Sequence, residues 1–127
     1  MPKNILIVDD SASIRQALSF VLSNNGFSVT EASDGDEALE KCASKHFDLI
    51  ISDVNMPNTD GITFASKLKK EKEYTGNSAT PFIMLTTESS EELKEEGREA
   101  GVKVWMVKPF PPQKLLETVN DICGIRQ

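Results

Sequence analysis

Short apolar runs recur along this chain, and they constrain its fold more than any other feature. Four of them are Ile5–Val8, Leu49–Ser52, Phe82–Leu85 and Val104–Val107. Continuous aliphatic runs of this kind are typical of strands buried on both faces of a parallel sheet. A fifth run, 27–32, alternates apolar and polar residues and is expected to form a less buried edge strand.

Each run is followed by a stretch in which apolar residues have helical spacing. The first and fourth of these helices are expected to begin at the capping serines Ser13 and Ser89. The polar stretch 69–80 is expected to be a long connection between the third helix and the fourth strand. The alternation predicts five strand–helix units, (βα)5, in which right-handed crossovers place helices on both faces of one parallel sheet.

Composition places the chain among soluble globular domains and excludes several functions. The 127 residues are 39% hydrophobic and 27% charged, a length and balance that suit a single domain. With a formal charge of −6, the chain lacks the excess of basic residues that is typical of a nucleic-acid binder. Neither a membrane-spanning stretch nor a signal-type apolar segment is present, so no membrane insertion is expected. Cys42 and Cys123 are not in a C-x-x-C pair, which predicts free thiols in a reducing cytoplasm.

Polar residues follow the predicted strands where each one ends. In open α/β sheets the ligand crevice lies just beyond the carboxyl ends of the strands, so these side chains should converge there. Asp9 and Asp10 follow the first strand. Either could be a helix N-cap, but two adjacent acids repel each other, and a bound cation removes that cost. Magnesium prefers a few carboxylates together with water and phosphate oxygens.

Asp53 should face the same crevice, as a third metal ligand or as a nucleophile that forms an aspartyl phosphate. Asn55 can offer its backbone carbonyl to the metal. Phosphoryl transfer mainly needs positioning and neutralisation of the equatorial oxygens, which the Thr86 hydroxyl and the Lys108 ammonium can supply. The only histidine, His46, belongs to the opposite end of its strand and is expected to be a surface residue.

Five signatures, taken together and in order, resemble those of the response-regulator receiver domains, and in particular the stand-alone CheY-like chemotaxis regulators. They are Leu-Ile-Val-Asp-Asp at 6–10, Asp-Val-Asn-Met-Pro at 53–57, Asp-Gly at 60–61, Thr86, and Lys-Pro-Phe at 108–110. The resemblance covers the whole sequence. It implies one receiver domain over residues 1–127, with a flavodoxin-like, doubly wound sheet in the strand order 2-1-3-4-5.

The resemblance also implies a chemistry for the strand ends. Asp53 would accept a phosphoryl group from the phosphohistidine of a sensor kinase. Asp9, Asp10, Asp53 and the Asn55 carbonyl would hold Mg²⁺. Lys108 would pair with a phosphoryl oxygen, and its peptide bond to Pro109 would be cis.

A switch follows from the same resemblance. Thr86 would swing toward the phosphoryl group, and Trp105 would change rotamer with it, altering the surface of the fourth helix, fifth strand and fifth helix. Family members usually carry Tyr or Phe in place of Trp105 and Ala or Gly in place of Thr87, so an indole is expected to hinder the inward rotamer and Thr87 to crowd the site. Asn55 and Glu88 match positions that tune phosphoryl lifetime, and their polarity predicts a short-lived phosphoprotein.

The leading hypothesis is therefore a monomeric phospho-switch of a two-component system, which modifies only itself and is not an enzyme for other substrates. The sequence stops at Gln127, so output is expected through a protein partner, with a chemotaxis kinase upstream and the flagellar motor switch downstream. One alternative is a phosphorelay carrier. A dehalogenase-type phosphatase generally needs a second acid at the place of Asn55, and a flavodoxin's flavin phosphate would be repelled by Asp9 and Asp10.

Overall fold

The computed structural model describes residues 2–124, and its strands form one five-stranded parallel sheet in the order β2-β1-β3-β4-β5. The strands are β1 (Asn4–Val8), β2 (Ser28–Ala32), β3 (Leu49–Ser52), β4 (Phe82–Thr86) and β5 (Val104–Val107). The predicted strand order is confirmed, and the alternating strand β2 lies at an edge as expected. Val8 pairs with Ser52, which places the residues that follow β1 and β3 side by side.

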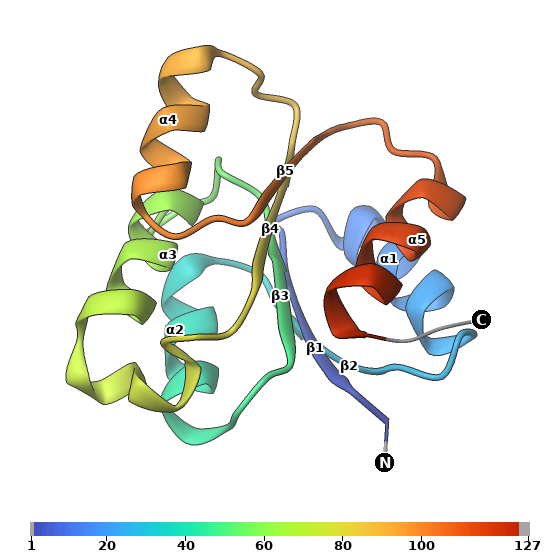
Figure 1. The fold of residues 1–127 in the computed structure, drawn as a ribbon, viewed down its shortest axis with the longest axis horizontal. Helices are drawn as coiled ribbons and strands as arrows, with labels where there is room; N and C mark the ends of the chain where they lie inside the picture. The colour runs from blue at the N-terminus through green and yellow to red at the C-terminus, as the bar shows by residue number, and fades with distance from the viewer. Residues whose placement is uncertain (1, 125–127) are drawn as a thin grey trace.

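Helices cover both faces of the sheet (Figure 1). They are α1 (Ala12–Ser23), α2 (Gly35–Ser44), α3 (Gly61–Lys70), α4 (Glu91–Glu99) and α5 (Pro112–Cys123). In Figure 1, α1 and α5 lie on one face, and α2, α3 and α4 lie on the other. This is the doubly wound arrangement that right-handed crossovers produce.

Alternate residues of the central strands point into two separate hydrophobic cores. Leu6 and Ile50 pack with α2, α3 and α4, whereas Ile5 and Ile51 pack with α1 and α5. All four side chains are buried, which is why β1 and β3 are continuous aliphatic runs. The two cores hold the strand ends in fixed register, and the candidate site depends on that register.

Two predicted helix caps are wrong by one or two residues. The α1 cap is Ser11, whose hydroxyl accepts the Ile14 N–H, rather than Ser13. The α4 cap is Ser90, whose hydroxyl accepts the Leu93 N–H, rather than Ser89. Each prediction chose between two nearby serines of equal capping propensity. The choice is made by how the helix packs on the sheet, which the local sequence does not reveal.

The polar connection 69–80 is more ordered than expected. It contains the 3₁₀ helix η1 (Lys72–Asn77), and it is held by the buried side chain of Asn77. The Asn77 amide donates to the Cys42 and Lys45 carbonyls at 2.9 and 2.8 Å and accepts the Phe47 N–H at 2.8 Å. One asparagine therefore joins this connection to the end of α2 and the start of β3.

The histidine and the two cysteines agree with the sequence-based predictions over the described residues. His46 is exposed ahead of β3, at the opposite end of that strand from Asp53, as predicted. Cys42 and Cys123 are free; burial raises the pKa of the Cys42 thiol to about 12. Over residues 2–124, no helix is both long and apolar enough to cross a membrane. Gln127 lies outside the described residues.

Candidate functional site

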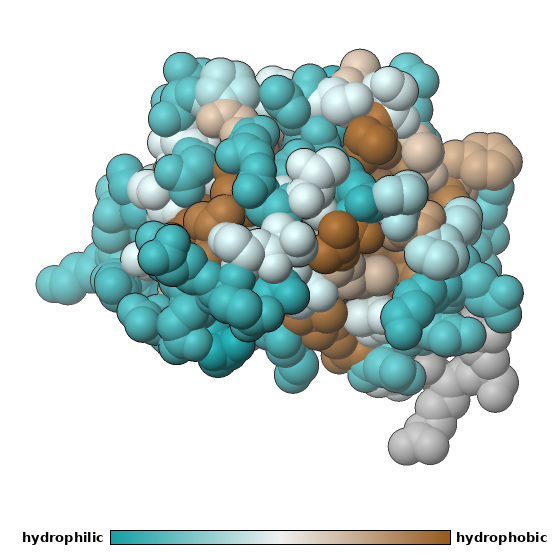
Figure 2. All heavy atoms as spheres, turned by 90° about the horizontal axis from the view of Figure 1, so that it is seen from above, coloured by the Kyte–Doolittle hydropathy of each residue, from teal (hydrophilic) through white to brown (hydrophobic). Residues whose placement is uncertain are grey.

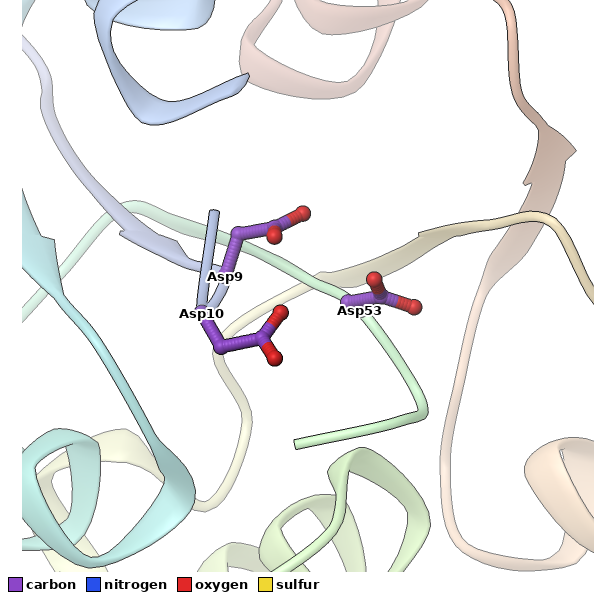
Figure 3. Close-up of side chains that lie close together, drawn as sticks. All are labelled: Asp9, Asp10 and Asp53. Atoms are coloured by element: carbon purple, nitrogen blue, oxygen red, sulfur yellow. The ribbon is translucent and has the colours of Figure 1, made fainter. Parts of the chain in front are cut away.

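Three carboxylates meet at the carboxyl edge of the sheet (Figure 3). Asp9 and Asp10 follow β1, and Asp53 follows the neighbouring strand β3. One carboxylate oxygen from each lies within 4.8 Å of the others. Asp9 and Asp53 are buried, at 2% and 9% exposure, whereas Asp10 faces solvent. The structure thus brings together the three acids that the sequence placed on this rim.

A single ammonium group lies between the two buried carboxylates. The Lys108 Nζ atom donates to Asp9 Oδ2 at 2.7 Å and to Asp53 Oδ2 at 2.9 Å. Burial alone would lower the pKa of Lys108, but the hydrogen bonds and charges of Asp9 and Asp53 outweigh it and raise that pKa above its ordinary value. The Lys108–Pro109 peptide bond is cis, as predicted. The contact with Asp9 was not predicted.

Backbone N–H groups and one arginine hold Asp9 and Asp53 in place. Asp9 Oδ1 accepts the Ser11 N–H at 2.9 Å, and Asp53 Oδ1 accepts the Val54 N–H at 2.6 Å. Arg15 donates from Nη1 to the Asp9 backbone carbonyl at 2.6 Å and pairs through Nε with Glu31. Sequence reasoning missed Arg15, because nothing in a helical pattern shows that a side chain reaches back to the preceding loop.

The loop between Asp53 and α3 is tied down on two sides. Asn58 donates from Nδ2 to Asp34 Oδ2 at 2.8 Å, and Thr59 donates from Oγ1 to Asp36. These contacts fasten the loop to the beginning of α2. The α3 helix begins at Gly61, directly against the Asp53 backbone: a Cβ atom on Gly61 would lie 2.0 Å from the Asp53 carbonyl oxygen. The position of Asp53 therefore depends on loop contacts as well as on β3.

The proposed switch and lifetime residues converge on Glu88. Thr86 is fully buried at the end of β4, and its hydroxyl accepts the Glu88 N–H at 3.3 Å. The Glu88 carboxylate accepts from Asn55 Nδ2 at 2.8 Å, and its backbone carbonyl accepts from Trp105 Nε1 at 2.9 Å. Thr87 is exposed. The indole of Trp105 is partly buried and packs on the α2–α3–α4 core.

The donor set at the rim suits a hard divalent cation. Within the cluster of Asp9, Asp10 and Asp53, every candidate ligand atom is a carboxylate oxygen. Oxygen donors of this kind favour Mg²⁺, Ca²⁺ or Mn²⁺ over the softer metals that thiolates and imidazoles attract. With Lys108 counted, the cluster carries three negative charges and one positive charge. A divalent cation would balance the remaining charge and fits these residues.

Fold and site together define a class: a doubly wound α/β domain with an acidic, lysine-containing site at the carboxyl ends of its strands. The model of the response regulator receiver domain matches residues 5–120. The chain belongs to the response regulator receiver domain family.

Relatives within the family differ in architecture. The chain is 40% identical over 118 residues to the transcriptional regulatory protein ResD of Bacillus subtilis, covering 93% of this chain and 47% of ResD. It therefore spans about half the length of that curated relative. The chemotaxis response regulator CheY4 of Vibrio cholerae is 44% identical, with a TM-score of 0.88 over 96% of this chain and 99% of that chain.

A third similar structure is the receiver domain of the sensor histidine kinase PA1611 of Pseudomonas aeruginosa. It has a TM-score of 0.86 and covers 98% of this chain and 99% of that chain, but at 23% identity it shows the fold alone. That protein has a magnesium ion coordinated in its active site cleft.

Proposed function

We propose that this chain is a phosphorylation-dependent regulator in which Asp53 accepts a phosphoryl group from the phosphohistidine of a sensor kinase. A bond would form between an Asp53 carboxylate oxygen and phosphorus, while the phosphorus–nitrogen bond breaks and the kinase histidine leaves with the electron pair. The observation that carries the proposal is the position of Asp53. It is fixed by a backbone N–H, touches the Lys108 ammonium, and lies beside two further acids.

Asp9, Asp10, Asp53 and the Asn55 carbonyl would hold Mg²⁺, whose charge would offset the repulsion between the incoming phosphoryl group and these acids. Lys108 already lies against the acceptor carboxylate, so it can transfer its hydrogen bond from Asp53 to a phosphoryl oxygen without crossing the site. Thr86 is the last residue of β4, the strand next to β5, and its backbone carbonyl accepts the Lys108 N–H at 2.8 Å. These contacts support a role for Thr86 as the sensor of the new group.

We further propose that the output is binding to a protein target, as a cytoplasmic monomer that catalyses no reaction on other substrates. The similarity to CheY4, whose whole chain is matched, supports a chemotaxis kinase upstream and a flagellar motor switch downstream. Viewed onto the carboxyl ends of the strands, apolar residues are exposed mainly on the side of α1 and α5 (Figure 2). Val107, which precedes Lys108, is 43% exposed and offers apolar contact next to the site.

Phosphoryl labelling tests the acceptor directly. Incubation with Mg²⁺ and acetyl phosphate should label Asp53, and the Asp53→Ala variant should not be labelled. Peptide mass mapping identifies the labelled residue, and omission of Mg²⁺ should reduce the labelling rate strongly. Labelling at another residue, or labelling that survives Asp53→Ala, would contradict the proposal. Transfer of the group onward from Asp53 to a histidine protein would favour a phosphorelay carrier instead of a terminal switch.

The phosphorylated protein is expected to be short-lived. The two lifetime positions are polar and are joined to each other through Asn55 Nδ2 and Glu88 Oε2, which leaves neither one to form an apolar cover over Asp53. Decay of labelled protein after removal of the phosphodonor measures the half-life. Persistence of the label for many hours would rule out this expectation while leaving the assignment of Asp53 intact.

A further inference from the structure

The indole of Trp105 lies directly over a helical glycine. In α4, a Cβ atom on Gly97 would lie 2.8 Å from Trp105 Cζ3 and 3.2 Å from Cε3. Gly97 is buried, although the helix around it is strongly polar and its neighbours Glu96 and Arg98 are exposed. The indole therefore occupies the space that any other residue at position 97 would fill with its side chain.

The helical backbone gives no reason for this glycine. Gly97 is inside α4 and does not have a positive φ, so an alanine could adopt the same conformation. Glycine in a helix interior is less favourable than alanine because it has more conformational freedom to lose. The space over the helix is what requires glycine here. The missing side chain at 97 therefore leaves room for the large ring opposite it.

The indole that packs on Gly97 also contacts the loop that leads to the acidic site. Trp105 Nε1 donates to the Glu88 backbone carbonyl, while the Glu88 carboxylate accepts from Asn55, two residues beyond Asp53. The Asn55–Glu88 hydrogen bond joins the loop that begins with Asp53, after β3, to the loop after β4, the strand that ends at Thr86. A continuous set of contacts thus runs from Gly97 through Trp105 and Glu88 to the rim.

We propose that Gly97 is a positioning residue for the switch: it provides the seat for the Trp105 indole, and the seated indole holds Glu88 against Asn55. Loss of the seat would release Glu88, open the gap between the two loops, and admit water to the phosphorylated site. The effect on phosphoryl lifetime rests on the proposed function of Asp53. The seat itself does not, because it is formed by side chains and backbone groups already in contact.

The Gly97→Ala variant tests the seat. Its methyl group should push the indole outward, so tryptophan emission should shift to longer wavelength and acrylamide quenching should increase, with no phosphodonor present. Trp105 is the only tryptophan in the chain, so the signal has one source. The half-life of the Asp53 phosphate should shorten at least about threefold, a change typical of coupling between linked sites. Gly76→Ala is the matched control, since nothing lies within 4 Å of a Cβ there.

A double variant separates the seat from a general effect on α4. Phenylalanine lacks the indole's fused ring and its N–H, so Trp105→Phe alone should also shorten the half-life, and Gly97→Ala should add little to it. Unchanged emission and half-life in Gly97→Ala would overturn the proposal. The proposal would also be overturned if Gly97→Ala shortened the half-life in the Trp105→Phe protein by the same factor as in the wild type. If Gly97→Ala does not fold, an unchanged half-life in Trp105→Phe overturns it. Failure of wild-type labelling at Asp53 would instead contradict the proposed function, and the emission result would still decide the seat.

Discussion

Replacing Lys108 with methionine should destabilise the metal-free protein by about 3 kcal/mol, the usual cost of removing one partner from a buried ion pair. The ammonium donates to Asp9 and to Asp53, both of which are buried. Without it, two carboxylates at the centre of the site face each other with no positive charge between them. Methionine retains most of the apolar stem, so the loss reports the charge and its hydrogen bonds.

Urea unfolding in EDTA and in saturating Mg²⁺ measures this effect. If the acids bind the cation, Mg²⁺ should restore much of the stability lost in Lys108→Met, because it supplies positive charge to the same carboxylates. Lys103→Met is the matched control: Lys103 is exposed and forms no ion pair with any described residue, so its change should be within about 0.5 kcal/mol. A metal-free Lys108→Met protein as stable as the wild type would contradict the expectation.

The difference in unfolding free energy between the wild type and Lys108→Met should change with pH in one direction. The pKa of Lys108 is raised in the folded protein above the ordinary value of 10.5. A raised pKa in a basic group stabilises the fold fully below the unfolded pKa, and the contribution disappears as pH rises through the folded pKa. The stability difference between wild type and Lys108→Met should therefore be equal at pH 7 and pH 9 and should decrease only above about pH 10.5.

The buried strands could be predicted from local sequence because burial on both faces makes consecutive residues apolar, whereas the strand order followed from the resemblance to the receiver family. Ile5 and Leu6 point to opposite cores, so both must be apolar, and the run they belong to is unambiguous. Helix ends leave no comparable pattern in the sequence. Two serines near one helix start offer the same hydroxyl, and only packing on the sheet decides between Ser11 and Ser13 or between Ser90 and Ser89.

The residues of the site were predictable, but most of their supporting contacts were not. Asp9, Asp53 and Lys108 sit at strand ends, and parallel strands deliver their ends to one rim. The reach of Arg15 to the Asp9 carbonyl, and the hydrogen bond from Asn58 to Asp34, depend on the positions of loops and helices far apart in sequence. Periodicity reports which face of an element is buried, and it says nothing about which polar side chain crosses to another element.

Gly61 is the sharpest example of such a contact. Asp-Gly at 60–61 is one of the five signatures, and its glycine is the first residue of α3, with its Cα facing the Asp53 backbone. A Cβ at this position would lie 2.0 Å from the Asp53 oxygen, 2.9 Å from its carbonyl carbon and 3.1 Å from Val54 Cα. All three are backbone atoms, so no flexible side chain can move aside. The Gly61 N–H also donates to the Val54 carbonyl at 2.9 Å, which holds α3 close.

Gly61→Ala should therefore destabilise the protein by about 3 kcal/mol, at the upper end of the cost of overpacking, and should also displace Asp53. Magnesium affinity should fall at least tenfold, as it does when the residues that orient metal ligands are changed. Urea unfolding gives the stability, and thermal shift against Mg²⁺ concentration gives the affinity at temperatures where the variant is folded. Gly76→Ala should leave both unchanged within about 1 kcal/mol. A stable Gly61→Ala protein with wild-type magnesium affinity would show that the α3 helix can retreat without moving Asp53.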